Sequence, residues 1–193
     1  MIRYAVMVGE EKGGEVHHLI TRDEVTLTLR SLLVTRDGET WEDSGVVMDS
    51  QTLRPLSSRK NIPYPAAGGV LELDTRYQEH AASIRLRSPA GTKEASIPLI
   101  GPTYDLEQIP LLFSLLDPTA IESLNVSILV PISGMVWRGR LRRVSEDTES
   151  IRFRFTLAGE VLYFRFSREA PYLPLEIEAP HRGYVLRKVE GRL

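Results

Sequence analysis

Hydrophobic and polar residues alternate with a period of two along almost the whole chain, and this pattern predicts β-strands. Leu27 and Leu29, for example, fall on one face of an extended segment, while Thr26 and Thr28 fall on the other. Turn-forming residues, such as the Asp-Gly pair at 37–38, separate such segments at intervals of about 8–12 residues. Most connections are too short for helical crossovers, so we expect an antiparallel sheet of about twelve strands.

One stretch, Tyr104–Pro118, interrupts the alternation. Asp105 and Gln108 stand three residues apart, as in a capping box. In this motif the side chain of each residue accepts a hydrogen bond from the free backbone N–H of the other. Pro110 is compatible with the first turn of a helix, and the Asp-Pro pair at 117–118 ends it. Apolar residues recur at helical spacing within the stretch: Leu106, Ile109, Leu112, Phe113, Leu115 and Leu116. We therefore expect one short helix, over about 105–116, as a lid or plug on a curved sheet.

Length and composition indicate a single domain. The chain has 193 residues, of which 42% are hydrophobic and 26% charged, with a formal net charge of -2. A domain of this length buries about 70% of the surface of its unfolded chain, which is enough for a sizeable core. With no fixed-period repeat and no clear linker, residues 1–193 are predicted to form one mainly β domain. Strands at this spacing are typical of an all-β sandwich or barrel.

The absence of cysteine excludes disulfides, thiol catalysis and thiolate metal sites. The first residues, MIRYAVMVGEEKGG, contain neither the apolar core nor the cleavage site of a signal peptide. A strand is predicted from Ile2 without any preceding loose residues, so we expect that an N-terminal piece has been removed from a longer chain. The sequence alone therefore assigns no compartment.

Three segments carry a resemblance to a known family. They are MDSQTLRP, with Asp49, Leu53 and Pro55; Tyr104 to Asp117; and the end of the chain, from Leu173 and Pro174 to Leu193. In their order and pattern they resemble bacterial envelope proteins of unknown function that are similar to the LolA/LppX superfamily of lipoprotein carriers. The resemblance implies an unclosed antiparallel β-barrel capped by helices, located in the cell envelope or periplasm. It supplies no catalytic motif, and no export signal is visible in this chain.

The resemblance also implies a concave apolar surface that holds an acyl chain. A filled core is the alternative, because any curved sheet must bury one face. The residues predicted to line the pocket or its lid are Leu106, Ile109, Leu112, Phe113, Leu116, Trp137, Phe153, Phe155, Phe164 and Phe166.

Arginines form a second candidate site. Alternation places each set on one face of a strand, and pairing of the two strands would join them into one patch. Such a patch suits an anionic headgroup or an acidic partner, and the alternative is an ordinary solvated strand face. The residues are Arg138, Arg140 and Arg142 on one predicted strand, and Arg152 and Arg154 on the next.

Motifs for catalysis or metal binding are not found in the sequence. His17 and His18 are adjacent on a strand and therefore point to opposite faces, while His80 and His181 are isolated. No serine lies in a GxSxG elbow, and the glycine-rich segment GEEKGG lacks the features of a phosphate-binding loop. We expect no enzyme activity, no metal and no cofactor.

The predicted function is non-catalytic binding or carriage of a lipid or lipoprotein acyl chain in the cell envelope. The alternative is a structural or protein-interaction module with a packed core, whose arginines dock an envelope protein partner. A third class, a hydrolase, would require a buried His–carboxylate pair facing a serine. We expect no nucleic acid partner, and we expect exposed edge strands to be covered or to pair in a homodimer.

Overall fold

The computed structural model describes residues 1–64 and 68–191, and in these residues one sheet contains 15 strands. The strands are β1 (Ile2–Val8), β2 (Glu11–Arg22), β3 (Thr26–Thr35), β4 (Thr40–Asp49), β5 (Pro55–Tyr64), β6 (Gly69–Tyr77), β7 (Ala81–Ser88), β8 (Gly91–Pro98), β9 (Thr103–Asp105), β10 (Ser123–Val130), β11 (Met135–Glu146), β12 (Ser150–Leu157), β13 (Glu160–Ser167), β14 (Pro174–Ala179) and β15 (Tyr184–Gly191). Among the described residues, one α-helix, α1 (Ile109–Leu115), follows a 3-10 turn at Leu106–Gln108, and two further 3-10 turns lie at Pro118–Ala120 and Pro180–Arg182.

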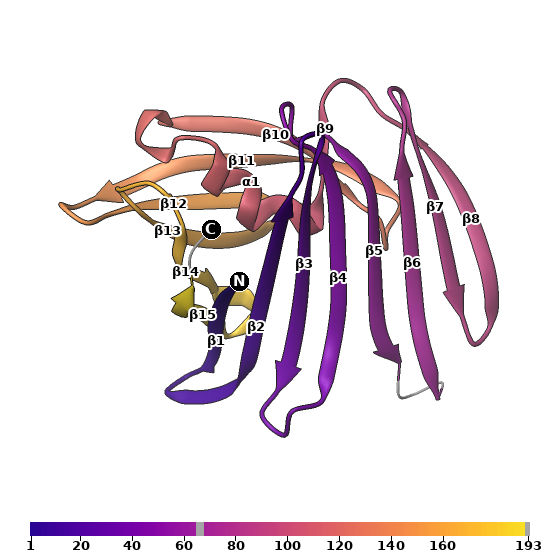
Figure 1. Ribbon diagram of the computed structural model, residues 1–193, viewed down its shortest axis with the longest axis horizontal. Coiled ribbons are helices and arrows are strands. Elements are labelled where there is room, and N and C mark those ends of the chain that lie inside the picture. Colours follow the sequence, from indigo (N-terminus) through magenta and orange to yellow (C-terminus); the bar gives the residue numbers. More distant parts are fainter. Residues whose placement is uncertain (65–67, 192–193) are drawn as a thin grey trace.

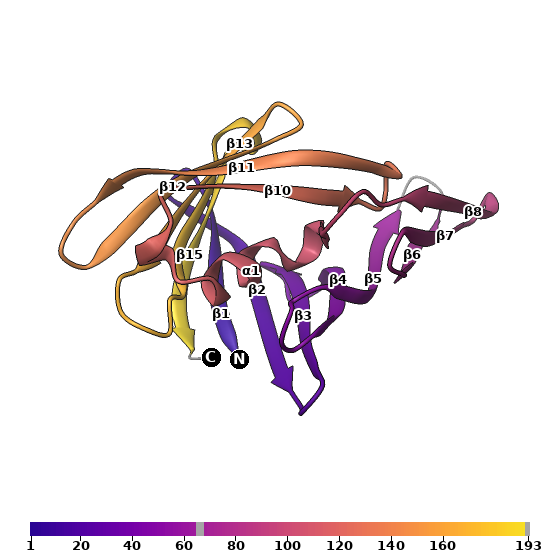
Figure 2. The ribbon, with the colours of Figure 1, turned by 90° about the horizontal axis from the view of Figure 1, so that it is seen from above.

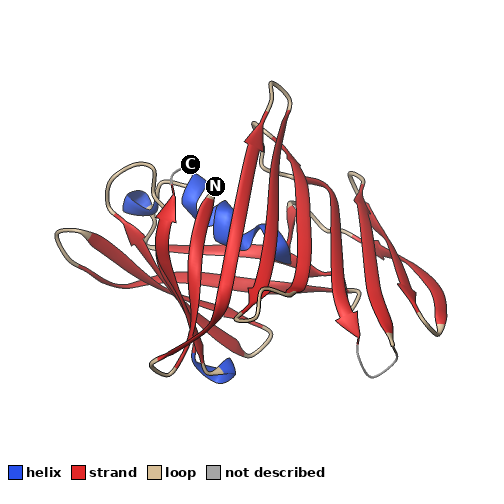
Figure 3. Cartoon of the chain, turned by 60° about the horizontal axis from the view of Figure 1, so that its bottom comes forward, coloured by secondary structure: helices blue, strands red, loops and turns tan. Residues whose placement is uncertain are grey.

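The two ends of the chain meet in the middle of the sheet. Its strand order is β8-β7-β6-β5-β4-β3-β2-β1-β15-β14-β13-β12-β11-β10-β9, so the first and last strands are neighbours. They pair antiparallel from Ile2 opposite Gly191 to Met7 opposite Val185. The sheet is therefore continuous, with β8 and β9 at its two ends and the first and last strands, β1 and β15, side by side (Figure 3).

The ribbon folds back over itself. Strands β1–β8 run upright in Figure 1, while β10–β13 cross them at a steep angle. Seen from above, α1 lies between the two halves, inside the curve (Figure 2). The short strand β9 leads into this helix, and it pairs with β10 in parallel, whereas the other pairings of the described strands are antiparallel.

The prediction of a curved, unclosed, mainly β sheet with one short helix is confirmed. The prediction of about twelve strands is wrong, because the described sheet has 15. Strand β9 has only three residues, too few to show an alternating pattern. The two prolines and two glycines of the segment 61–69 also predict a loop, but residues 61–64 continue β5 and Gly69 begins β6, while 65–67 lie outside the described residues.

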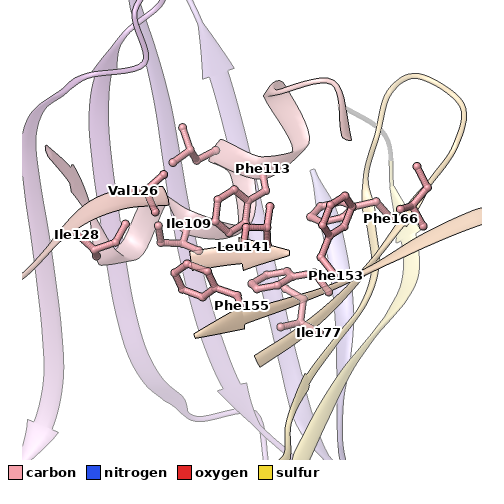
Figure 4. Packing of buried hydrophobic residues seen from close by; sticks show 12 residues of the cluster. Ile109, Phe113, Val126, Ile128, Leu141, Phe153, Phe155, Phe166 and Ile177 are labelled. Carbon is pink, nitrogen blue, oxygen red and sulfur yellow. The ribbon is translucent and has the colours of Figure 1, made fainter. Parts of the chain in front are cut away.

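The largest hydrophobic cluster lies between α1 and strands β10–β14. It combines Ile109, Leu112 and Phe113 of the helix with four buried phenylalanines of β12 and β13 (Figure 4). Close packing there requires a glycine at 139, since a Cβ would stand 2.7 Å from the Phe155 ring. A second cluster joins the opposite side of α1, through Leu111, to β3 and β4. The helix thus connects the two halves of the sheet.

Among the described residues, none of the helices has both the length and the apolar composition needed to cross a membrane.

Candidate functional site

Nine of the ten residues predicted to line an acyl-chain pocket, all except Trp137, form a filled core. Phe113, Phe153 and Phe166 are completely buried, and the other helix and strand members are buried or half-buried against them. The helix ring of Phe113 lies edge-on to Phe155 and Phe164, with ring centroids 5.3 Å and 5.6 Å away. Edge-to-face and offset contacts of this kind are the favoured geometries of aromatic rings. Side chains therefore occupy the space that the sequence suggested for a ligand.

A small gap remains on the other side of the helix. It measures about 10 Å³ and lies between Pro110, Leu111, Leu29, Tyr4 and His18, among others. A gap of this size can hold at most one water molecule. An acyl chain has no space of its own beneath α1 in the described structure.

Trp137 is the one predicted pocket residue that the structure places elsewhere. It lies near the start of β11, opposite Ile128, and its exposed fraction is 36%. This end of the β10–β11 hairpin extends past α1, so the helix does not cover it (Figure 2). The tryptophan is therefore part of the surface and is separate from the phenylalanine cluster.

The entry to α1 is fixed by a buried polar network. Asp105 and Gln108 form the predicted capping box, with the Asp105 amide donating to Gln108 Oε1 at 3.0 Å. The Gln108 side chain also donates to the Leu53 carbonyl at 3.0 Å. Leu53 adopts a left-handed backbone conformation, with φ of 59°, and its side chain packs against both clusters that α1 joins. A strained leucine persists only where its surroundings hold it, so this turn is part of the helix anchor.

Buried charges reinforce the same anchor. Lys60 Nζ on β5 lies 2.8 Å from Glu42 of β4 and 2.9 Å from Glu107 of the 3-10 turn. Together these two ion pairs connect β4 and β5 to that turn. Burial alone would lower the pKa of Lys60, but the two carboxylates outweigh it and raise the pKa. Tyr77 donates to Asp105 at 2.5 Å, and burial raises the pKa of the Asp105 carboxyl. These contacts hold α1 as a fixed plug.

His18 is buried on β2 and contacts a serine. Its Nδ1 lies 2.7 Å from Ser31 Oγ, its ring is edge-on to Tyr4, and its Nε2 has no hydrogen-bond partner in the described structure. Burial, together with the neighbouring His17, lowers the pKa of His18 to about 4. A hydrolase would need a carboxylate to orient this histidine, and none of the described side chains supplies one.

The five predicted arginines lie on one face, as the alternation indicated. They project to the outside of β11 and β12, and buried Leu141, Phe153 and Phe155 alternate with them on the inside. The pairing of the strands sets Arg142 directly opposite Arg154. We call the exposed outer arginines of these strands and the next the arginine face: Arg138, Arg140, Arg142, Arg152, Arg154 and Arg165.

Acidic side chains of the same chain pair with the arginine face only at Arg152 and Arg165, among the described residues. Arg152 pairs with Glu178 at 2.7 Å and covers the Tyr163 ring, and Arg165 lies 3.8 Å from Glu176. In the described part of the chain, four members have no carboxylate within 4.0 Å: Arg138, Arg140, Arg142 and Arg154. Arg142 and Arg154 thus place two unpaired like charges side by side, an arrangement that disfavours strand pairing.

The next arginine along β11 has a different role. The Arg143 side chain turns inward, is 15% exposed, and donates to the carbonyls of Thr119 at 2.7 Å and Ile121 at 2.9 Å. It also pairs with Glu122 and Glu146. This arginine fixes the turn between α1 and β10, so it belongs to the fold and not to the arginine face.

An apolar surface at the end of the β10–β11 hairpin was missed by the sequence reasoning. We call it the apolar tip: Ile132 (56% exposed), Met135 (48%), Val136 (36%), Trp137 (36%) and the neighbouring Ile100 (91%). The signal was present as PISGMVW, apolar residues on both sides of a Ser-Gly turn and directly before Arg138. Taking the segment only as a turn between strands concealed it.

A broad hollow occupies the outside of β3–β8. Its volume is about 1150 Å³, and polar side chains line most of it. Several of its charges are paired across strands, as in Arg30 with Asp43 at 2.8 Å and Arg85 with Glu94 at 2.7 Å. The hollow thus differs from the arginine face, where partners are fewer.

Comparison with known proteins extends the description of the fold. No protein-family model and no curated protein matches the chain. Among solved structures, the chain is similar to a beta-barrel-like protein of the domain of unknown function DUF1849 from Brucella abortus. The TM-score is 0.59 at 8% identity, over 97% of this chain and 94% of that one. Identity this low shows the fold alone. Similarity to the LolA/LppX superfamily stays a prediction.

Proposed function

We propose that the protein is a non-catalytic interaction module that binds an anionic partner on its arginine face. The observation that carries the proposal is the group of four exposed arginines without a carboxylate within 4.0 Å among the described residues. Arginine binds carboxylate and phosphate oxygens through two parallel hydrogen bonds, so such a group suits an anionic surface.

The charge distribution supports this function. The whole chain has a net charge of -2, so the arginine face is a local positive region on a slightly negative molecule. Local fields of this kind orient a charged partner during encounter and increase the rate of association. The packed inner surface of the same strands provides a rigid base for the arginines.

Carriage of an acyl chain, the other predicted function, has less support. A chain bound beneath α1 would have to displace Phe113 from the rings of Phe155 and Phe164. It would also have to disturb the contacts of Gln108 with Leu53 and of Lys60 with Glu107. The packed interior therefore favours a binding site on the outside.

The proposal is tested by retention of the purified protein on immobilised heparin, a soluble polyanion used as a probe, over a salt gradient. The double variant Arg142→Gln/Arg154→Gln should elute at clearly lower salt. Binding to heparin depends on contacts between opposite charges, which salt screens, and the variant has fewer of them. The matched control Arg30→Gln/Arg85→Gln removes the same charge from the paired outer surface of β3 and β7, and should elute close to wild type. Equal shifts for both variants would show that only net charge matters and would reject the arginine face.

A further inference from the structure

The apolar tip adjoins the arginine face. Trp137 immediately precedes Arg138 on β11 and points to the opposite face of the strand, whereas Arg138, Arg140 and Arg142 follow the turn along the outer surface. From residue 123 to residue 145 the sequence contains four arginines and neither aspartate nor glutamate. An apolar end backed by positive charge is thus built into one hairpin.

The tip is a defined structure. In the β10–β11 turn, the amides of Ser133 and Gly134 both donate to the Val130 carbonyl at 3.1 Å, and the Ser133 hydroxyl donates there as well. Gly134 has φ of 63°, which allows the tight reversal. The apolar side chains are therefore presented by a turn whose inner amides are already bonded.

A second segment completes the tip. Leu99, after β8, is buried in a cluster with Leu129 of β10, which brings the connection from β8 to β9 beside the hairpin. A side chain added at Gly134 would meet Ile97 at 3.5 Å, which places the two segments in contact. Ile100, 91% exposed, stands next in this uncharged connection. Two chain segments thus contribute exposed apolar residues to the same end of the β10–β11 hairpin, which lies beside β8 in Figure 2.

We infer that the anionic partner is the surface of a lipid bilayer, into which the apolar tip inserts while the arginine face contacts anionic headgroups. This inference rests on the proposed function. A bilayer surface offers anionic groups above an apolar layer, and the hairpin presents both complements in the same order. Tryptophan favours the headgroup level because it is apolar with one polar end. An acidic protein would match the arginines, but it would leave the apolar tip uncovered.

The test uses the full chain and two kinds of vesicle: phosphatidylcholine alone, and phosphatidylcholine with phosphatidylglycerol. The chain has two tryptophans, so Trp41→Phe makes Trp137 the only indole reporter. On the anionic vesicles Trp137 fluorescence should shift to the blue and be quenched by brominated acyl chains. On neutral vesicles the shift should be much weaker, because the arginines lack their counter-charge.

Variants separate the tip from the charges. Ile132→Ser/Met135→Ser should weaken binding to anionic vesicles by at least about tenfold, since part of the inserted apolar area is lost. It should leave heparin retention unchanged. The control Val8→Ser/Val25→Ser alters two residues that are also exposed, at 57% and 65%, at the end of β1 and just before β3, and should bind vesicles as wild type does.

The outcomes distinguish this inference from the proposed function. Heparin retention that depends on Arg142 and Arg154, without vesicle binding, would overturn the membrane inference and leave an acidic protein as the partner. Vesicle binding that is unaffected by Ile132→Ser/Met135→Ser would overturn insertion of the tip. If Arg142→Gln/Arg154→Gln binds both heparin and vesicles as wild type does, the proposed function itself is overturned.

Discussion

The two faces of β11 and β12 belong to the same strands but have different surroundings. On the inside, Leu141, Phe153 and Phe155 are at most 1% exposed and are enclosed by α1 and β13. On the outside, Arg140 and Arg154 are exposed and have no carboxylate within 4.0 Å in the described residues. The chain itself supplies packing partners for the inner side chains, but its described residues supply no carboxylate partner for these two outer arginines.

This difference indicates where a partner binds. A filled aromatic core has nothing to gain from a ligand unless it first opens, which costs the contacts already made. Unpaired, neighbouring arginines are disfavoured in the free protein, and an anionic partner would relieve that repulsion. The comparison can be sharpened by changes that act on one face and spare the other.

The largest effect should come from the inner face. Phe164 packs against Phe113, Phe155 and Phe166, with ring centroids 5.6, 6.2 and 5.8 Å away. Replacing it in Phe164→Ala should lower the free energy of unfolding by about 3–5 kcal/mol, because a cavity replaces those contacts. Urea unfolding measures the loss. The adjacent outward residue provides a control, and Arg165→Ala should change stability by about 0.5 kcal/mol or less.

A loss well below about 2 kcal/mol for Phe164→Ala would contradict a filled core. It would mean that the ring borders open space, as the acyl-chain prediction requires.

The next effect depends on pH. His18 has a pKa lowered from 6.5 to about 4 in the folded protein, so between these values the unfolded chain binds more protons. The contribution of His18 to the free energy of unfolding is fully present above pH 6.5 and is lost as the pH falls towards 4. Each pH unit in this range lowers the free energy of unfolding by about 1.4 kcal/mol, which amounts to about 3 kcal/mol by pH 4.

The raised pKa of the buried Asp105 carboxyl acts on stability in the opposite direction. The stability difference between wild type and His18→Gln isolates the histidine, and it should change by about 3 kcal/mol from pH 7 to pH 4. A flat difference for His18→Gln would show that the His18 imidazole is accessible to water.

The smallest effect separates two neighbouring arginines. Arg143→Met removes hydrogen bonds to the carbonyls of Thr119 and Ile121, and should cost about 2 kcal/mol of stability. Arg142→Met removes an exposed side chain and should cost about 0.5 kcal/mol or less. Thermal or urea unfolding measures both. Equal losses would mean that the arginine face contributes to folding, which would weaken its assignment to a partner.

Local chemistry made parts of this fold predictable. The period-two alternation identifies most strands because successive side chains point to opposite faces. Asp105 and Gln108 identify the start of the helix, since a capping box needs only residues three positions apart. The same alternation placed Arg138, Arg140 and Arg142 together. Such features depend on neighbours in the chain, so the sequence contains them.

Features that depend on distant residues were not predictable in this way. The short strand β9 exists because β10 pairs with it, and the bond between Gln108 and Leu53 joins positions 55 residues apart in sequence. An apolar strand face looks the same whether it borders a ligand or a helix, so only packing could show that the phenylalanines fill the interior.

The sequence by itself determined a curved β-sheet, its single helix and the alignment of its arginines, because backbone geometry converts spacing into faces. Tertiary structure decided which charged residues form ion pairs or hydrogen bonds and which apolar residues are buried. Lys60 and Arg143 were drawn into contacts with distant groups, whereas Arg142 and Trp137 were left at the surface. That outcome depends on how the two halves of the sheet cross, which is a long-range property of the fold.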